Sequence, residues 1–330
     1  MGISFICNRN QENFFMNMLN LPKKVYFKKG SMNVALKELD EVYGFRRAFI
    51  ISDPGLYRAG AVYPVTDLLR QRGIRSAEFF NISGVPTIAE IKSGLPKMQE
   101  FEPDVIIAVG GGSVISAAKA MWLQYENPEA DLAAVAAEHS RLTGTDVGFP
   151  QVGARAKLVA VATSFGTGAQ NSPFAVIADD AGRKKVIASY TLLPEISVTD
   201  SLFAESMPAE LIRESGLSLI SQVIRAYASP DCNAYTKGIL TVAAEGVLKN
   251  LEAAVKGCRD ALYSLGNAGS IAGFAVGNAV DTIDPDAGLY PSKKEKGADS
   301  AAVDELAAAL GLADGEALAG AVEKLAALQG

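Results

Sequence analysis

The chain has 330 residues, of which 49% are hydrophobic and 21% charged, a composition typical of a globular protein that buries a large core. A net charge of −6 without a long run of Lys or Arg excludes non-specific nucleic-acid binding, so no nucleic-acid partner is expected. Nowhere do about 18 uncharged apolar residues follow one another, which excludes a membrane-spanning helix and predicts no membrane partner.

The N-terminal segment, residues 1–20, is predicted to be a poorly ordered leader that packs only in part. It lacks the basic segment, long apolar core and cleavage site of a signal peptide. The three cysteines, Cys7, Cys232 and Cys258, are widely separated and form neither a disulfide framework nor a metal-binding pattern. Such cysteine use fits a reducing compartment, and we expect a cytoplasmic protein.

Strand-like apolar runs alternate with helical patterns over the first half of the chain. The runs lie at residues 24–27, 47–52, 77–80, 105–109, 157–163 and 174–178. Helical patterns separate several of them, at residues 34–43, 61–71, 87–101 and 113–125. Strands that alternate with helices predict a parallel sheet, covered by helices on both faces, in a Rossmann-like α/β domain.

The composition changes after about residue 206, where strand signals almost disappear. Successive helices are predicted at residues 208–227, 234–255 and 265–280. Residues 281–300 contain two prolines and several charges and read as a loop, and residues 301–329 read as two small alanine-rich helices. The second half is therefore predicted to be an all-α domain.

A buried strand that turns through three glycines into a helix is the clearest ligand-binding motif. The five apolar residues of 105–109 suit a strand covered on both faces, and Gly110, Gly111 and Gly112 allow a tight turn before the helix. From Ser113 onward, this helix offers free N–H groups and the positive end of its dipole to an anion. The motif predicts a cradle for the pyrophosphate of a dinucleotide.

Two further segments could contact such a dinucleotide. Asp53 follows the apolar run 47–52, where a carboxylate can accept both hydroxyls of an adenine ribose and repel a 2′-phosphate, which would favour NAD over NADP. The alternative is that Asp53 simply opens a tight turn. Hydroxyls and glycines also follow the buried run 157–163, and they either approach the cofactor or form only a glycine-rich turn; the hydroxyls belong to Thr163, Ser164 and Thr167.

These stretches together resemble the iron-containing (group III) alcohol dehydrogenases, and most closely the alcohol dehydrogenase half of bifunctional aldehyde-alcohol dehydrogenases. The resemblance runs from about residue 19 to residue 279. It is specific in three places: residues 101–113 with the glycine turn, residues 117–129 in the following helix, and residues 173–177.

The resemblance implies a dinucleotide-binding α/β domain over residues 21–205 and a helical domain over residues 206–330, with NAD(H) in the cleft between them. This is the architecture of dehydroquinate synthase-like proteins and iron-type alcohol dehydrogenases. Asp53 would then meet the adenine ribose. The rest of the dinucleotide would lie against two groups of residues, Gly110, Gly111, Gly112 and Ser113 at the pyrophosphate, and Thr163, Ser164 and Thr167 beyond it.

The resemblance also implies a divalent metal, iron or zinc, that polarises the substrate oxygen during hydride transfer. The family holds this metal with one Asp and three His, the first two spaced four residues apart on one helix. Here Ser218 stands at the aspartate position and Gln222 at the first histidine, with Arg225 where the family usually has a glutamate. The helix that would carry the other histidines is missing after Ala279, where several tens of residues of the family are absent. We therefore expect no iron or zinc.

Smaller departures affect the same predicted site. Ser116 replaces an Asp of the family motif, and residues 169–170 read Ala-Gln where the family has Ser-Glu. The single histidine, His139, lies in a polar stretch and is expected to be a solvated surface residue. Lys119 and Lys184 match family lysines, for which packing and phosphate neutralisation are expected rather than proton transfer.

The missing helix would expose apolar surface on residues 265–279, so we expect either oligomer formation, as a homo-dimer or larger homo-oligomer, or marginal stability. Two functions stay open. In the first, the chain is an iron-type alcohol dehydrogenase homologue that binds NAD(H) but has lost its metal site and is weakly active or inactive. In the second, it is an active NAD-dependent dehydrogenase that interconverts short-chain alcohols and aldehydes. The replaced ligands favour the first, and no catalytic residue is identified.

Overall fold

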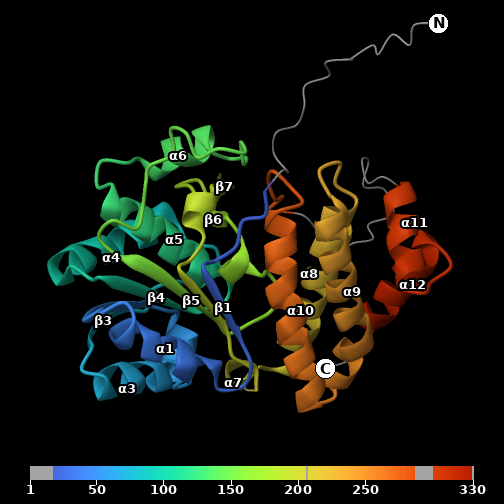
Figure 1. The fold of residues 1–330 in the computed structure, drawn as a ribbon, viewed down its shortest axis with the longest axis horizontal. Coiled ribbons are helices and arrows are strands. Elements are labelled where there is room, and N and C mark those ends of the chain that lie inside the picture. The colour runs from blue at the N-terminus through green and yellow to red at the C-terminus, as the bar shows by residue number, and fades with distance from the viewer. Residues whose placement is uncertain (1–17, 206, 287–299, 329–330) are drawn as a thin grey trace, which may run out of the picture.

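Six parallel strands form the main sheet (Figure 1). The computed structural model describes residues 18–205, 207–286 and 300–328. In spatial order the strands are β1 (Lys24–Phe27), β8 (Ile196–Thr199), β5 (Lys157–Ala162), β4 (Val105–Gly110), β2 (Arg47–Ile51) and β3 (Arg75–Phe79). All their pairings are parallel, which confirms the predicted Rossmann-like α/β sheet.

Helices cover both faces of this sheet. One face carries α1 (Ser31–Glu41) and α3 (Tyr63–Gln71), and the other carries α4 (Ile88–Phe101) and α5 (Gly112–Glu126). Side chains along β2 alternate between these layers: Ala48 and Ile50 belong to the core cluster with α1 and α3. Phe49 and Ile51 belong to the cluster with α4 and α5. The central strand β4 is buried at every position, which explains its continuous apolar run.

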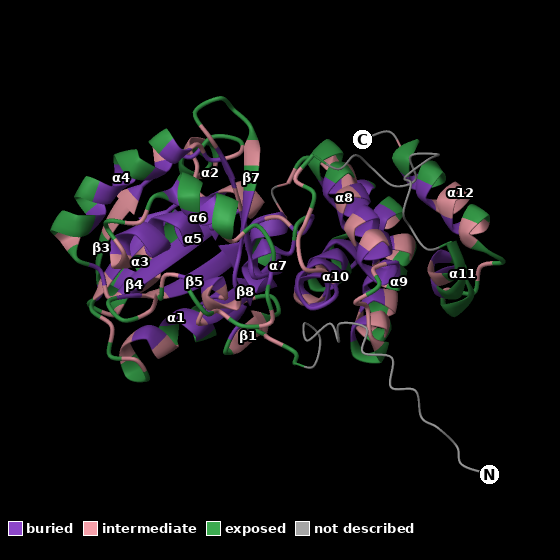
Figure 2. Cartoon of the chain, turned by 90° about the horizontal axis from the view of Figure 1, so that it is seen from above, coloured by how far each residue is buried: buried purple, intermediate pink, exposed green. Residues whose placement is uncertain are grey.

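The helices that follow the sheet form a unit with its own core (Figure 2). They are α8 (Ala209–Tyr227), α9 (Ala234–Val255), α10 (Arg259–Gly277), α11 (Ser300–Ala309) and α12 (Gly315–Ala326). Val223 of α8, Val247 of α9 and Leu265 of α10 are completely buried in this core, and α11 and α12 pack on its outer side. The predicted all-α second part of the fold is confirmed.

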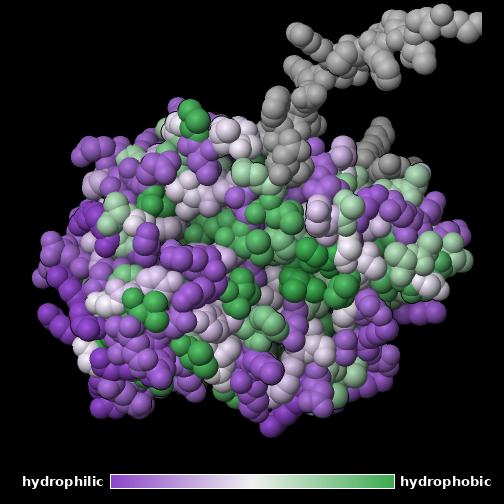
Figure 3. Space-filling view, in the orientation of Figure 1, coloured by the Kyte–Doolittle hydropathy of each residue, from purple (hydrophilic) through white to green (hydrophobic). Residues whose placement is uncertain are grey.

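Glycines let α10 pack directly on the turn that follows β5. A Cβ atom added at Gly273 would lie 2.0 Å from the carbonyl oxygen of Gly168, and one at Gly269 would lie 2.2 Å from another carbonyl of the same turn. Asn171 adds a polar contact, because its Nδ2 donates to the Ser270 carbonyl at 2.8 Å. On the face shown in Figure 3, hydrophobic side chains gather near the middle, where the two halves meet, while the left and lower margins are mostly hydrophilic. The backbones of the two halves are therefore in direct contact where α10 meets this turn.

The prediction of sheet strands was wrong in one place. The run 174–178 does not join the main sheet but forms an antiparallel hairpin from β6 (Phe174–Ala178) and β7 (Lys184–Ala188). β8 takes the place beside β5 instead. Neither β7 nor β8 was predicted, because β7 starts with two lysines and β8 has no continuous apolar run, since Ser197 and Thr199 alternate with its two apolar residues.

Some helix boundaries also differ from the prediction. The short helices α2 (Pro54–Arg58) and α6 (Leu132–Glu138) were not predicted, and α10 spans Arg259–Gly277 rather than residues 265–280. The apolar surface expected to be exposed on residues 265–279 is largely buried, because α10 packs against α8 and α9. That expectation was wrong, so exposure of this helix gives no support for oligomer formation.

The predicted pair of alanine-rich helices is confirmed by α11 and α12. Most of the predicted leader and of the loop 281–300 lies outside the described residues, which begin at residue 18 and omit residues 287–299. Within the described part of the chain, no helix is long and apolar enough to cross a membrane.

Candidate functional site

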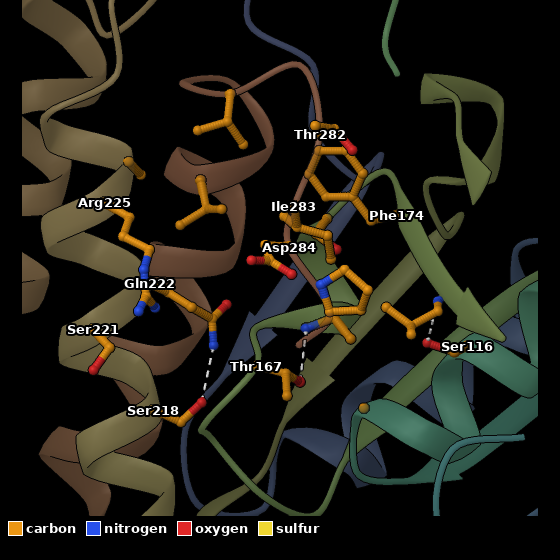
Figure 4. Close-up of a pocket in the computed structure, with 18 of the residues that line it drawn as sticks. Ser116, Thr167, Phe174, Ser218, Ser221, Gln222, Arg225, Thr282, Ile283 and Asp284 are labelled. Atoms are coloured by element: carbon orange, nitrogen blue, oxygen red, sulfur yellow. Dashed lines mark hydrogen bonds between the residues drawn. The ribbon is translucent and has the colours of Figure 1, made fainter. Parts of the chain in front are cut away.

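A cavity of about 400 Å³ lies where the two halves meet, beyond the carboxyl ends of β4 and β5 (Figure 4). Ligands of open α/β sheets bind at this edge of the sheet. The walls come from the start of α5, the chain from residue 167 to β6, the helix α8, and residues 280–285. Residues with hydroxyl side chains line the cavity from each of these walls: Ser113, Ser116, Thr167, Ser172, Ser218 and Thr282.

The predicted glycine cradle is formed at the junction of β4 and α5. β4 ends at Gly110, Gly111 is the N-cap residue, and α5 begins at Gly112. A Cβ at Gly112 would lie 2.7 Å from Thr167 Oγ1, and one at Gly111 would lie 3.0 Å from Ser164 Oγ. The glycines therefore let Ser164 and Thr167 pack closely on the backbone of the cradle, and the structure brings together the two segments that were predicted to share a cofactor.

The remaining predicted residues of these segments differ in exposure. Ser113 and Thr167 line the cavity. Thr163 is buried, and its N–H donates to the Gly110 carbonyl at 3.1 Å, so it holds the end of β5 against the cradle. Thr167 Oγ1 accepts a hydrogen bond from the Ala169 N–H. Contacts of these groups with a dinucleotide stay a prediction.

Asp53 directly follows β2 and is the N-cap residue of α2. Its Oδ1 accepts a hydrogen bond from the Leu56 N–H at 2.9 Å, so the alternative role, opening a turn, is confirmed. A Cβ on Gly55 would lie 2.9 Å from the same oxygen, so glycine leaves the carboxylate uncovered on that side. Because β2 pairs with β4, Asp53 and the cradle share one sheet edge. Contact with a ribose stays a prediction.

Ser218 and Gln222, which the resemblance places at metal-ligand positions, line the cavity from α8 (Figure 4). Gln222 Nε2 donates to Ser218 Oγ at 3.1 Å and to the Gly166 carbonyl at 2.8 Å. Gln222 thereby links α8 to the turn after β5. Arg225, whose side chain is positively charged whereas a typical metal ligand is anionic or neutral, lines the same wall. Among the residues that the structure describes, no group of three His, Cys, Asp or Glu side chains is placed to hold a metal ion.

Residues 280–286, which we call the crossing segment, run from the end of α10 back to the α/β half. Asp281 forms an ion pair with Arg141 at 2.7 Å, and its carbonyl accepts the Leu142 N–H at 2.6 Å. Lys184 Nζ bonds the Pro285 carbonyl at 3.0 Å and pairs with Asp286 at 2.8 Å. Lys184 thus serves packing, as expected, by holding this segment over the cavity.

Lys119 lies behind the cavity wall and is completely buried. Its Nζ donates to the carbonyls of Ala169, Ser172 and Phe174. One turn earlier on α5, Ser116 Oγ accepts the Val176 N–H at 3.1 Å. Burial lowers the pKa of Lys119 from the usual lysine value to about 7. The expected packing role is present, while phosphate neutralisation does not fit a group enclosed by main-chain carbonyls.

His139 differs from its prediction as a solvated residue. It is half-buried, and its ring packs edge-on against Phe149 with centroids 5.1 Å apart. The histidine lies away from the residues that line the main cavity, so it gains no chemical role there. The polar sequence around His139 did not reveal this aromatic contact.

Sequence reasoning missed the contribution of the crossing segment to the cavity. Thr282, Ile283 and Asp284 line the cavity, and Asp284 lies opposite Gln222 of α8 (Figure 4). The only sequence signal was the pair of apolar residues Val280 and Ile283 in an otherwise polar loop. Both pack on the β6–β7 hairpin cluster, which could not be inferred without knowing where that hairpin lies.

The fold and cleft define a two-part architecture, a Rossmann-like sheet followed by a helical unit. The family model of iron-containing alcohol dehydrogenase matches residues 22–201, and the chain belongs to this family. Aldehyde-alcohol dehydrogenase 2 of Entamoeba histolytica and bifunctional aldehyde-alcohol dehydrogenase AdhE of Escherichia coli are each 36% identical to 80% of this chain. The chain spans about 30% of the length of these relatives.

Solved structures support the same architecture. An iron-containing alcohol dehydrogenase from Thermococcus thioreducens is similar over 93% of this chain and 85% of its own, with a TM-score of 0.80 and 23% identity. A sulfoacetaldehyde reductase from Bifidobacterium kashiwanohense, solved in complex with NAD+, is similar over 93% of this chain and 84% of its own, with a TM-score of 0.76 and 20% identity. At these identities the likeness establishes the fold alone.

Proposed function

We propose that the chain binds NAD(H) in the cleft but has lost the metal-dependent step of its family, so that it interconverts alcohols and aldehydes weakly or not at all. The observation that carries the second part is the pairing of Gln222 with Ser218 and Gly166. The side-chain nitrogen of Gln222 donates to both of these acceptors, at the position where we expect the family to have an imidazole ligand. The first part depends on the uncapped glycine turn at the start of α5.

The residues of the cradle fit a dinucleotide. α5 spans 15 residues, starts at a glycine and has no side-chain cap, so its first N–H groups and the positive end of its dipole are left for an anion. Ser113 and Thr167 add hydroxyl donors, and Asp53 supplies a carboxylate for the adenine ribose at the neighbouring strand. The cavity beyond the cradle would take the nicotinamide end. When bound, NAD(H) supplies or accepts the hydride.

The residues at the family's metal position do not fit iron or zinc. Ser218 and Gln222 offer neutral oxygen atoms, which are weak ligands compared with a carboxylate and an imidazole. Arg225 places a guanidinium in the same wall, which disfavours a doubly charged cation. Family members use such a cation to stabilise the alkoxide from which hydride departs. We therefore propose no reaction step through a metal in this chain.

Binding of NADH is the first test. Titration of purified protein with NADH, followed by nicotinamide fluorescence, is expected to show saturable binding. Asp53→Ala is expected to weaken NADH binding by about tenfold and to reduce the preference for NADH over NADPH, because two charge-assisted hydrogen bonds and the repulsion of a 2′-phosphate are lost.

The substitution at Asp53 also removes a helix cap, so a matched control is needed. Asp314 caps α12 in the same manner, accepting the Ala317 N–H at 2.8 Å. Asp314→Ala is expected to cost a similar stability, about 1 kcal/mol, while leaving NADH affinity unchanged. Equal affinities for NADH in both variants would assign Asp53 to the turn alone, and absence of binding to the unmodified protein would refute the proposal.

A further inference from the structure

Lys119 makes an unusual set of contacts for a buried cation. Its Nζ lies 2.9 Å from the Ala169 carbonyl, 2.5 Å from that of Ser172 and 2.9 Å from that of Phe174. An ammonium group has three N–H donors, so each donor has one acceptor. Among the described residues, no charged side chain shifts the pKa of Lys119, for which burial is the only cause. The cation is therefore balanced by main-chain dipoles alone.

The three acceptors belong to one short piece of chain that also forms a wall of the cavity. Ala169, Ser172 and Phe174 line the cavity themselves. Lys119 donates its hydrogen bonds to this wall from the side away from the cavity. Ser116, on the same face of α5, accepts a further hydrogen bond from the Val176 N–H. α5 thus fixes both the cradle at its N-terminus and the wall beside its second turn.

We infer that Lys119 is a positioning residue, whose ammonium group holds residues 169–176 in the shape that accepts the nicotinamide end of the dinucleotide. This inference rests on the proposed binding of NAD(H) for its ligand, but the contacts that carry it do not involve the cofactor. A neutral amine has only two N–H donors for three carbonyl acceptors. Loss of the proton therefore leaves one buried carbonyl without a donor, which loosens the wall.

The charged form of Lys119 is the form that holds the wall, and this sets the direction of the pH effect. Burial brings the pKa of Lys119 down to about 7. Below that pH the ammonium group donates to all three carbonyls, and above it the neutral amine leaves one carbonyl without a donor. Affinity for NADH is thus expected to be highest on the acidic side and to fall as the pH rises through about 7.

Lys119→Met tests the role with little change in side-chain volume. We expect NADH affinity of the unmodified protein to fall by about tenfold between pH 6 and pH 8.5, the effect of one lost hydrogen bond to a charged group, and affinity of the variant to be low and independent of pH. The matched control is Lys97→Met, because Lys97 Nζ also donates to a main-chain carbonyl, that of Glu78 at 2.7 Å, but on the exposed surface. Lys97→Met should keep the pH profile.

A second measurement, which needs neither a ligand nor a variant, separates this inference from the proposed function. Amide hydrogen exchange of the unmodified protein, corrected for the intrinsic pH dependence, should show faster exchange at Asn171 and Val176 at pH 8.5 than at pH 6. Amides in the middle of α9 should show no such change. If NADH does not bind but these amides respond to pH, the proposed function fails and the positioning role stands. If protection is equal at both pH values, or if Lys119→Met keeps the pH profile, Lys119 does not position the wall.

Discussion

Replacement of Gly273 by valine is expected to lower the free energy of unfolding by about 3 kcal/mol or more. Even the first carbon of the new side chain would lie 2.0 Å from the Gly168 carbonyl oxygen, a backbone atom that cannot rotate away. α10 would have to move off the turn after β5, which would also break the contact between Asn171 and Ser270. Chemical denaturation followed by circular dichroism measures the loss.

The same turn carries Thr167, so the valine variant is also expected to bind NADH poorly. Gly238→Ala is the matched control, since Gly238 lies inside the helix α9 with no atom near the position of a Cβ. Alanine there should stabilise the protein by about 0.5–1 kcal/mol through its better helix propensity. A Gly273 variant as stable as the Gly238 variant would show that the two halves do not depend on this backbone contact.

Oxidation of short primary alcohols is expected to be about a thousand-fold or more slower than in a metal-bearing aldehyde-alcohol dehydrogenase measured in parallel. The reason is the loss of a Lewis acid at the substrate oxygen, which would otherwise stabilise the alkoxide. Elemental analysis of the same preparation is expected to find iron and zinc far below stoichiometric amounts. Stoichiometric metal together with rapid turnover would support the active dehydrogenase instead.

A double variant that introduces two metal ligands on α8 tests whether these two positions limit metal binding. Ser218→Asp combined with Gln222→His places an anionic oxygen and an imidazole one helical turn apart on the cavity face of α8. This double variant is expected to take up more zinc than the unmodified protein, because two strong ligands replace two weak ones. Equal zinc content in both proteins would mean that these positions are not what limits metal binding.

The parts of the fold that the sequence predicted are those controlled by local pattern. The continuous apolar run of β4 requires cover on both faces, and the glycines after it require a tight turn, so sheet and cradle could both be inferred. The β6–β7 hairpin was misplaced because an isolated apolar run does not reveal its partner. β8 was missed because its apolar residues alternate with Ser197 and Thr199 and form no continuous apolar run.

The candidate site was predictable only where neighbouring residues in the chain build it. The glycine turn, and the expectation that Ser218 and Gln222 stand in place of metal ligands, follow from motifs within single elements. The pairing of Gln222 with Gly166, and the wall supplied by residues 280–285, join segments that are far apart in the chain. Lys119 looked like an ordinary helix lysine, because its three acceptors lie in a turn whose path over α5 depends on tertiary packing.

The crossing segment has a mechanical consequence. The chain passes from the sheet to the helical unit after β8 and returns through residues 280–286, where Asp281 and Asp286 are tied to the α/β half. Asn20 and Asn278 add a third tie through reciprocal amide hydrogen bonds. Two units that are joined by a single segment of chain can rotate about it, whereas units that are also held together at a second segment resist rotation. Admission of a ligand should therefore change the radius of gyration very little.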